Sequence, residues 1–500
     1  MTAAAARGRR RRAGAVVVVL LLAAAAPSAL AAQDVRGWAT TTVRYTELRP
    51  LRADTVPIEL ATATAGGGFA VDGRAVQCVP GVGCVHWLPG PVQHAATATQ
   101  DLALTGWGFG VEGLSATLLA RGRSRLGGAL VWPRSEDAFD LILGYVQLNR
   151  GPLRARLGRQ ESLSGLGSTS FDGADVLAVL ARGIRIQAYG GRSLARGLVE
   201  PRDEALRGLQ DFLPERGVWL IGASVAAPAG PATTAELRYQ REIWSDRRGL
   251  VAERASLDAR SSALAPVSLS SALDYDVGMG RVGKGHLQAR LPLSAGAGAA
   301  AAVEATVRRY LPYFELYTIW GFFSPVAYHE AELRGSWGRA SVDAWALGAY
   351  RAYEDAQSGG FLVPASSRGW RLSGGGRWSP GPAWSVQGQY AVDLFPGAFL
   401  SSADVSLRRR LHERVAVTAT ATGFQQIEEF RLADGRTLGA ALAVDARIGE
   451  RVHLDVGAGA YRQVDGERGG AFDWSQLRGW SALRVEVGRD PALPRAGGAG

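Results

Sequence analysis

Apolar and polar residues alternate with a period of two along much of the chain. Between residues 438 and 448 every second residue is apolar, from Leu438 to Ile448, and Asp445 and Arg447 lie between them. A helix would distribute these apolar residues around its axis, whereas a strand collects them on one side. The pattern therefore predicts amphipathic strands, and it recurs at 235–240, 303–308, 386–393, 404–410, 452–460 and 483–487.

These segments have the length of strands that cross a bilayer at a tilt, about 9–11 residues each. Asp-Gly pairs at 72–73, 172–173, 434–435 and 465–466 are typical of tight hairpin turns. Beyond the N-terminal segment the chain has no apolar run long enough for a spanning helix, so a membrane location requires a closed barrel.

We expect an all-β protein, a transmembrane antiparallel up-and-down β-barrel that occupies residues 32–489. Allowing about 26 residues for each strand and its connection predicts about 18 strands, within a range of roughly 16–20. A soluble all-β protein of several domains is the alternative, but no Pro/Ser-rich linker divides the chain.

The first residues read as an export signal. Five arginines between Arg7 and Arg12 precede an apolar run from Ala13 to Ala26, which is followed by Pro27 and then by small residues at Ala29 and Ala31. This order is that of a secretory signal peptide, and the run is too short for a membrane anchor. We expect residues 1–31 to be removed, with cleavage after Ala32 as the alternative.

The net positive charge of the chain is smaller once this segment is removed. The whole chain carries +10, and five of those charges belong to the signal peptide, which contains no acidic residue. No basic run with interleaved aromatic residues follows, so the composition does not favour nucleic-acid binding. The expected partners are outer-membrane lipid and small polar or anionic solutes.

One stretch resembles a known family. Gly158, Arg159 and Gln160, followed by Phe171, Asp172 and Gly173 and by a strand at 184–191, resemble the outer-membrane alginate-export and related porin family. The resemblance implies a monomeric barrel of about 18 strands, with an arginine-rich lumen for anionic or polar solutes and a turn at Asp172-Gly173. The Pro/Gly/Ala-rich segment 490–500 departs from the family, whose chains end in an aromatic residue, and we expect it to be a disordered tail.

A long segment at 46–93 separates the first strand from the next and contains both cysteines. Cys78 and Cys84 flank Pro80, Gly81 and Gly83, so a tight loop brings their sulfurs together. Export to an oxidising compartment favours a disulfide. A metal or redox role is the alternative, although His86 and His94 lack recognisable ligand spacing.

The polar face of the strands gives the candidate site. If this face points inward, it lines a water-filled lumen with nearly balanced charge and a mild preference for anions. The expected lining residues are Arg154, Arg156, Arg238, Arg308, Arg408, Arg410, Arg447, Arg451, Arg484, Glu236, Glu304, Asp393, Asp445 and Asp455.

Motifs for other chemistry are scarce. The sequence has no nucleophile elbow, zinc-protease motif or P-loop, so we expect neither an enzyme nor a cofactor. Residues 199–216 carry apolar residues at helical spacing, which fits a loop helix that either constricts the lumen or packs on the rim. The sequence favours a porin-like channel for passive passage of small polar or anionic solutes. A barrel that sheathes a cytochrome or a secretion component is the first alternative, and a membrane-embedded enzyme is the second.

Overall fold

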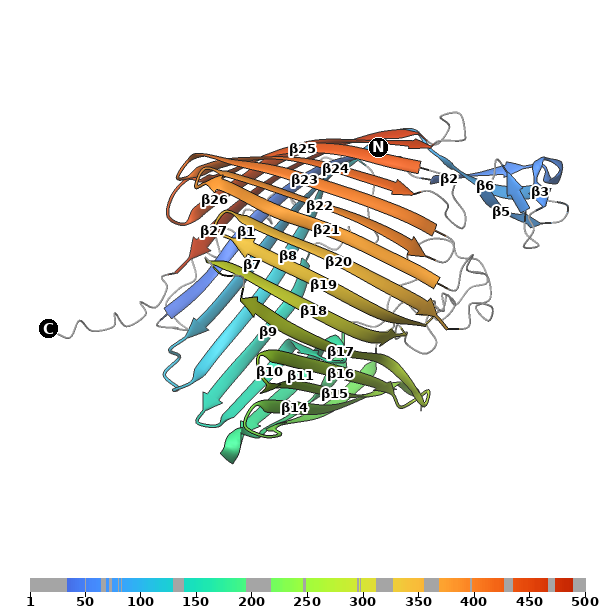
Figure 1. Cartoon of the computed structure of the whole chain (residues 1–500). Coiled ribbons are helices and arrows are strands. Elements are labelled where there is room, and N and C mark those ends of the chain that lie inside the picture. The colour runs from blue at the N-terminus through green and yellow to red at the C-terminus, as the bar shows by residue number, and fades with distance from the viewer. Residues whose placement is uncertain are drawn as a thin grey trace, which may run out of the picture.

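Hydrogen bonding between the alternating segments produces one closed antiparallel sheet of 22 strands (Figure 1). The computed structural model describes residues 34–49, 51–63, 69–71, 74–79, 81, 83–128, 139–194, 217–245, 249–294, 296, 298–311, 327–354, 368–395, 398–426, 435–465 and 473–488. Each strand pairs with the next along the chain, and β1 pairs with both β7 and β27, which closes the barrel.

The barrel consists of β1 and β7–β27. Their bounds are β1 Asp34–Leu48, β7 Gln93–Trp107, β8 Leu114–Gly128, β9 Phe139–Arg150, β10 Leu153–Ser164, β11 Gly167–Val179, β12 Arg185–Ser193, β13 Val218–Pro228, β14 Thr233–Trp244, β15 Leu250–Leu264, β16 Val267–Asp276, β17 Arg281–Ser294, β18 Ala299–Tyr310, β19 Tyr328–Arg339, β20 Val342–Tyr353, β21 Arg368–Gly381, β22 Trp384–Phe395, β23 Ala398–His412, β24 Val415–Gln426, β25 Gly435–Arg447, β26 Val452–Asp465 and β27 Trp474–Val487.

The strand count of 22 corrects the expected 16–20, while the all-β antiparallel barrel is confirmed. The estimate was low because it allowed too many residues for each connection. Several hairpins use only two connecting residues, for example 151–152, 340–341 and 413–414. Short connections fit more strands into the same length of chain.

The two ends of the barrel differ. Every connection at the end where β1 begins and β27 ends is short, at most six residues, and the pairing of Gly37 with Val487 identifies this end. The strands that are separated by more residues in sequence, such as β18 and β19, adjoin at the opposite end, where Tyr310 pairs with Tyr328. Short periplasmic turns and long extracellular loops are the general arrangement in outer-membrane barrels, so we refer to these as the periplasmic and extracellular ends.

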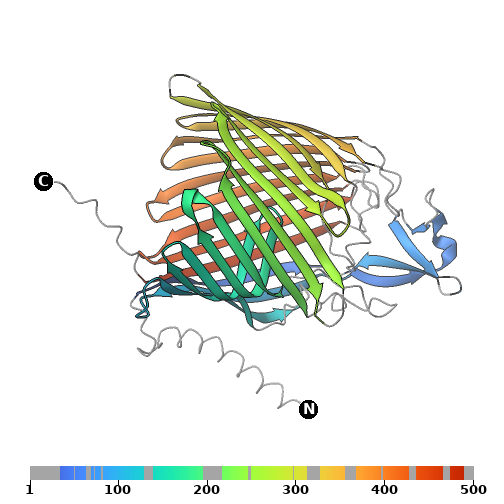
Figure 2. The same cartoon turned by 90° about the horizontal axis from the view of Figure 1, so that it is seen from below.

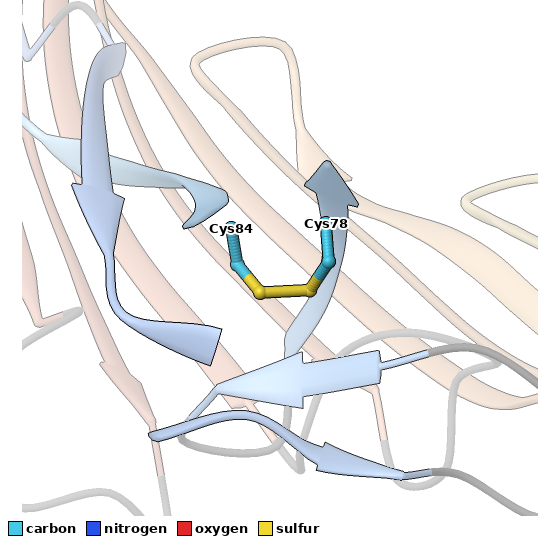
Figure 3. The surroundings of a disulfide bond; sticks show 2 residues. All are labelled: Cys78 and Cys84. Atoms are coloured by element: carbon cyan, nitrogen blue, oxygen red, sulfur yellow. A yellow bond between two sulfur atoms is a disulfide. The ribbon is translucent and has the colours of Figure 1, made fainter. Parts of the chain in front are cut away.

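A second sheet extends from the extracellular end between β1 and β7 (Figures 1 and 2). Its five strands pair in the order β2-β6-β5-β4-β3, and a short 3-10 turn, Ile58–Leu60, follows β2. The strands are β2 Leu51–Val56, β3 Thr62–Ala63, β4 Phe69–Val71, β5 Arg74–Val79 and β6 Gly83–Pro89. A disulfide joins Cys78 to Cys84 at the β5–β6 turn, which confirms the expected pairing (Figure 3).

Three expectations fall outside the described residues: the signal peptide at 1–31, the helix expected at 199–216, and the tail at 490–500. Among the residues that are described, no helix is long and apolar enough to cross a membrane.

Candidate transport pore

The outer face of the barrel is apolar and exposed. Leu157, Leu333 and Leu438 project from β10, β19 and β25 with 68%, 59% and 61% of their surface accessible. Trp337, Trp378 and Trp384 lie on this face near the periplasmic end, where an aromatic girdle meets the lipid headgroups. A closed sheet with such a surface has every strand paired and requires lipid around it, as in an outer-membrane protein.

Contacts between strands that are not neighbours identify the inner face. Arg238 on β14 donates a hydrogen bond from Nη1 to Ser162 Oγ on β10 at 3.5 Å. Arg254 on β15 donates from Nη1 to the carbonyl oxygen of Leu166, between β10 and β11, at 2.9 Å. Only the concave side of a sheet brings strands four or five positions apart into contact, so these side chains point inward.

These contacts fold β10–β15 into a compact unit, which we call the folded lobe. Its interior contains Phe171, Tyr189 and Leu220, which are almost fully buried against one another. The hydroxyl of Tyr189 donates to Gln240 Oε1 at 2.9 Å, and Gln240 donates in turn to Glu242 at 2.9 Å. Strands of the lobe, coloured teal to green, lie at the bottom of Figure 1.

The opposite part of the barrel has a hollow interior. We call β20–β27 together with β1, β7 and β8 the open wall. Arg408 and Asp445 pair at 3.3 Å on its inner face, yet each keeps about half of its side chain exposed, 52% and 51%. Arg377 and Asp343 are exposed to a similar extent. In the described part of the chain, no hydrogen bond or ion pair joins these side chains to strands across the barrel, and about half of each side chain is accessible to water.

Strand register places all the expected lining residues except one on the inner face. Residues paired across neighbouring strands point to the same side of the sheet. The inward residues of the lobe therefore identify the inward residues of each further strand around the barrel. Arg451 is the exception, because it lies in the turn between β25 and β26.

The expected lining residues nevertheless divide between two environments. Arg238 keeps only 7% of its side chain exposed and pairs with Glu236 at 2.7 Å inside the folded lobe. Arg154 pairs there with the buried Asp175 at 3.4 Å. Arg408 and Arg484, by contrast, face the open wall's lumen, with 52% and 47% of their side chains exposed. A polar inner position is therefore not enough to contact solvent.

The residues behind the family resemblance serve the lobe. Phe171 and Gln160 are fully buried on its inner face. Arg159 and Asp172 form a two-bond ion pair on the outer face, with distances of 2.7 and 2.9 Å. The turn expected at Asp172-Gly173 is wrong, because both residues lie inside β11. Gly173 is used there for close approach, since a Cβ would lie 2.0 Å from the carbonyl oxygen of Gly190.

A row of inward arginines on β8, which we call the arginine ladder, was not predicted from the sequence. Arg121, Arg123 and Arg125 occupy alternate positions and pair in register with Asp101, Thr99 and Thr97. Arg121 Nε donates to Asp101 at 2.5 Å, and Arg44 on β1 pairs in register with the same Thr97 that faces Arg125. Three arginines at a spacing of two within one strand are a visible signal, which would have identified this ladder.

In the described part of the chain, no group of three His, Cys, Asp or Glu side chains is arranged to hold a metal ion. Asp274 pairs instead with Arg254, and Asp276 accepts a hydrogen bond from the backbone of Met279 at 3.1 Å. These two buried acids of β16, beside the lobe, are thus engaged by the chain's own donors.

Comparison with known proteins supports the fold alone. No protein-family model and no curated protein sequence matches the chain. Among solved structures it is similar to the siderophore receptor PirA from Pseudomonas aeruginosa, with 10% identity and a TM-score of 0.50 over 90% of this chain and 80% of that one. The P. aeruginosa protein OccD3 (OpdP) aligns over 91% of both chains, at 9% identity and a TM-score of 0.35. The chain shares with PirA the architecture of a large closed barrel.

Proposed function

We propose that this protein is an outer-membrane channel through which small polar or anionic solutes pass passively. The observation that carries the proposal is the open wall, whose ion pairs remain about half exposed although they lie inside a closed barrel. A lumen lined by exposed charged groups holds water, and water-filled lumens conduct small solutes.

The arginine ladder supports a preference for anions. Arg121, Arg123 and Arg125 lie one above another along β8, and Arg44 lies beside them on β1. Among the described residues, Asp101 pairs with Arg121 at 2.5 Å and Asp140 pairs with Arg123 at 3.8 Å. The remaining positive charge favours anions along this side of the lumen.

Conductance across a planar bilayer tests the proposal. The purified barrel is expected to give stable open channels, and a salt gradient is expected to give a reversal potential of anion-selective sign. The triple variant Arg121→Gln, Arg123→Gln, Arg125→Gln is expected to move that potential toward cation selectivity. Arg409→Gln is the matched control, because Arg409 lies on the outer face over the ring of Trp384 at 4.7 Å. A barrel that does not conduct contradicts the channel.

Three finer points belong to the same proposal. The alginate-export resemblance favours anionic solutes, and it also favours a monomer. Removal of residues 1–31 completes export of the mature chain. A sheath around a partner protein predicts a different result in the same bilayer, namely a pore that leaks broadly or fails to stay open without its partner.

A further inference from the structure

A shallow trough crosses the outer face of the open wall. Small residues form its floor, where Ala421, Ala440 and Ala460 lie in register on β24, β25 and β26. Val405 on β23 and Leu477 on β27 continue the same row and form its two sides. The trough has a volume of about 630 Å³ and an almost entirely apolar lining. Neighbouring strands lie about 4.8 Å apart, so a trough that crosses five strands is wide enough for more than one acyl chain.

Two arginines lie on the outer face at the extracellular end of this trough. Arg462 is two residues beyond Ala460 on β26, or roughly 7 Å along the strand. Arg436 lies further toward the extracellular end on β25, and both side chains are exposed. Neither has an acidic partner among the described residues, and the outward Glu47 nearby accepts the backbone N–H of Leu477 at 2.9 Å.

This combination points to a lipid. A charged side chain on the lipid face costs about 2–4 kcal/mol at the bilayer midplane but little near the interface, where a phosphate can pair with it. We infer that the trough and the two arginines form a binding site for a phosphorylated, multiply acylated glycolipid of the outer leaflet. Its acyl chains lie along the alanine floor, and its phosphates pair with Arg436 and Arg462.

A second copy of the barrel fits this surface less well. A two-fold contact would bring the same patch of both copies together, so the arginines of one copy would face those of the other. Like charges placed opposite each other in a contact oppose association. The phosphate groups of a lipid supply the complementary charge that a second copy lacks.

Native mass spectrometry of the full-length barrel tests the site directly. The probes are diphosphoryl lipid A, the same lipid without its phosphates, and phosphatidylglycerol. We expect diphosphoryl lipid A to bind at about tenfold lower concentration than the other two, which corresponds to one charge-assisted contact or more. The double variant Arg436→Gln, Arg462→Gln is expected to lose this tenfold preference.

Ala440→Phe fills the floor of the trough and is expected to weaken binding of both lipid A forms. Arg409→Gln, at the periplasmic end of the outer face, is expected to leave binding unchanged. Unchanged conductance shows that each variant has folded. Equal binding by all of these proteins overturns the site, as does phosphatidylglycerol binding as tightly as diphosphoryl lipid A. A dimer that Ala440→Phe abolishes, with lipid binding unaffected, establishes the second copy instead.

Discussion

The folded lobe and the open wall have the same sequence pattern but opposite interiors. Both consist of strands with apolar residues on the outer face and polar residues on the inner face. In the lobe the inner residues Gln160, Gln240 and Glu242 are 1%, 5% and 3% exposed, because strands as far apart as β10 and β14 contact one another. In the open wall Asp343 is 55% exposed.

This difference separates stability from transport. Buried polar groups of the lobe require partners, and hydrogen bonds join Tyr189 to Gln240 and Gln240 to Glu242. Exposed ion pairs of the open wall are hydrated and contribute little to stability, but they set the field along the lumen. In the proposed channel, the lobe is a fixed side of the barrel and the open wall bounds the path for solutes.

The largest expected effect comes from the same substitution made in each region. Phe171→Ala empties the core of the lobe, where the ring is 0% exposed and lies 5.7 Å from the ring of Tyr189. A cost of about 3–5 kcal/mol in unfolding free energy is expected. Phe424→Ala removes an inward ring of the open wall that is already 42% exposed, at a cost of about 1 kcal/mol. Urea titration in lipid vesicles measures both, and equal losses would contradict the comparison.

Ion pairs give the next effect. Arg254→Met leaves Asp274, with 8% of its side chain exposed, buried without its arginine partner. The expected loss is about 3–5 kcal/mol, at the lower end if water reaches the carboxylate. Arg408→Met removes the partner of the half-exposed Asp445 and is expected to cost less than about 1 kcal/mol. The same titrations measure this pair of variants, and a larger loss for Arg408→Met would reverse the assignment of the two regions.

The smallest effect is a pH dependence at the extracellular rim. Glu354, just beyond β20, accepts hydrogen bonds from Arg309 at 2.7 and 2.9 Å, which lower the pKa of the carboxyl below its ordinary value of 4.5. A lowered pKa contributes stability above the ordinary value, and this contribution is lost as the pH falls through the lowered one. Between about pH 6 and pH 3 we expect the wild type to lose under about 1 kcal/mol more than Glu354→Gln. If the difference in stability between the wild type and Glu354→Gln is the same at every pH, this contribution is excluded.

Alternation predicted the strands well because it depends on which face of each strand is buried or wetted. The segment at 438–448 lies within β25 up to Arg447, and 452–460 lies within β26, with Leu438 and Leu442 outward as expected. The strand number was missed because hairpins such as 340–341 are shorter than an average connection. An Asp-Gly pair does not always mark a turn. At Gly173 the absence of a side chain leaves room for the backbone of the neighbouring strand.

The division into lobe and open wall was not predictable from local pattern. Arg238 and Arg408 occupy equivalent alternating positions, and only contacts between distant strands bury one of them. The inward position of Arg121, Arg123 and Arg125 could have been predicted from the sequence, since their spacing alone places them on one face of a strand. Curvature of the sheet arises from many such long-range contacts, which no short window of sequence contains.

Thiol accessibility during current recording tests the central claim most directly. Single cysteines replace Ser406 in the open wall and Ser224 in the lobe, in a chain whose Cys78 and Cys84 are serines. Both positions face inward, but Ser224 is only 6% exposed. A charged, membrane-impermeant thiol reagent is expected to reduce the current through Ser406→Cys and to leave Ser224→Cys unchanged. Current reduced through Ser224→Cys and not through Ser406→Cys would contradict the account.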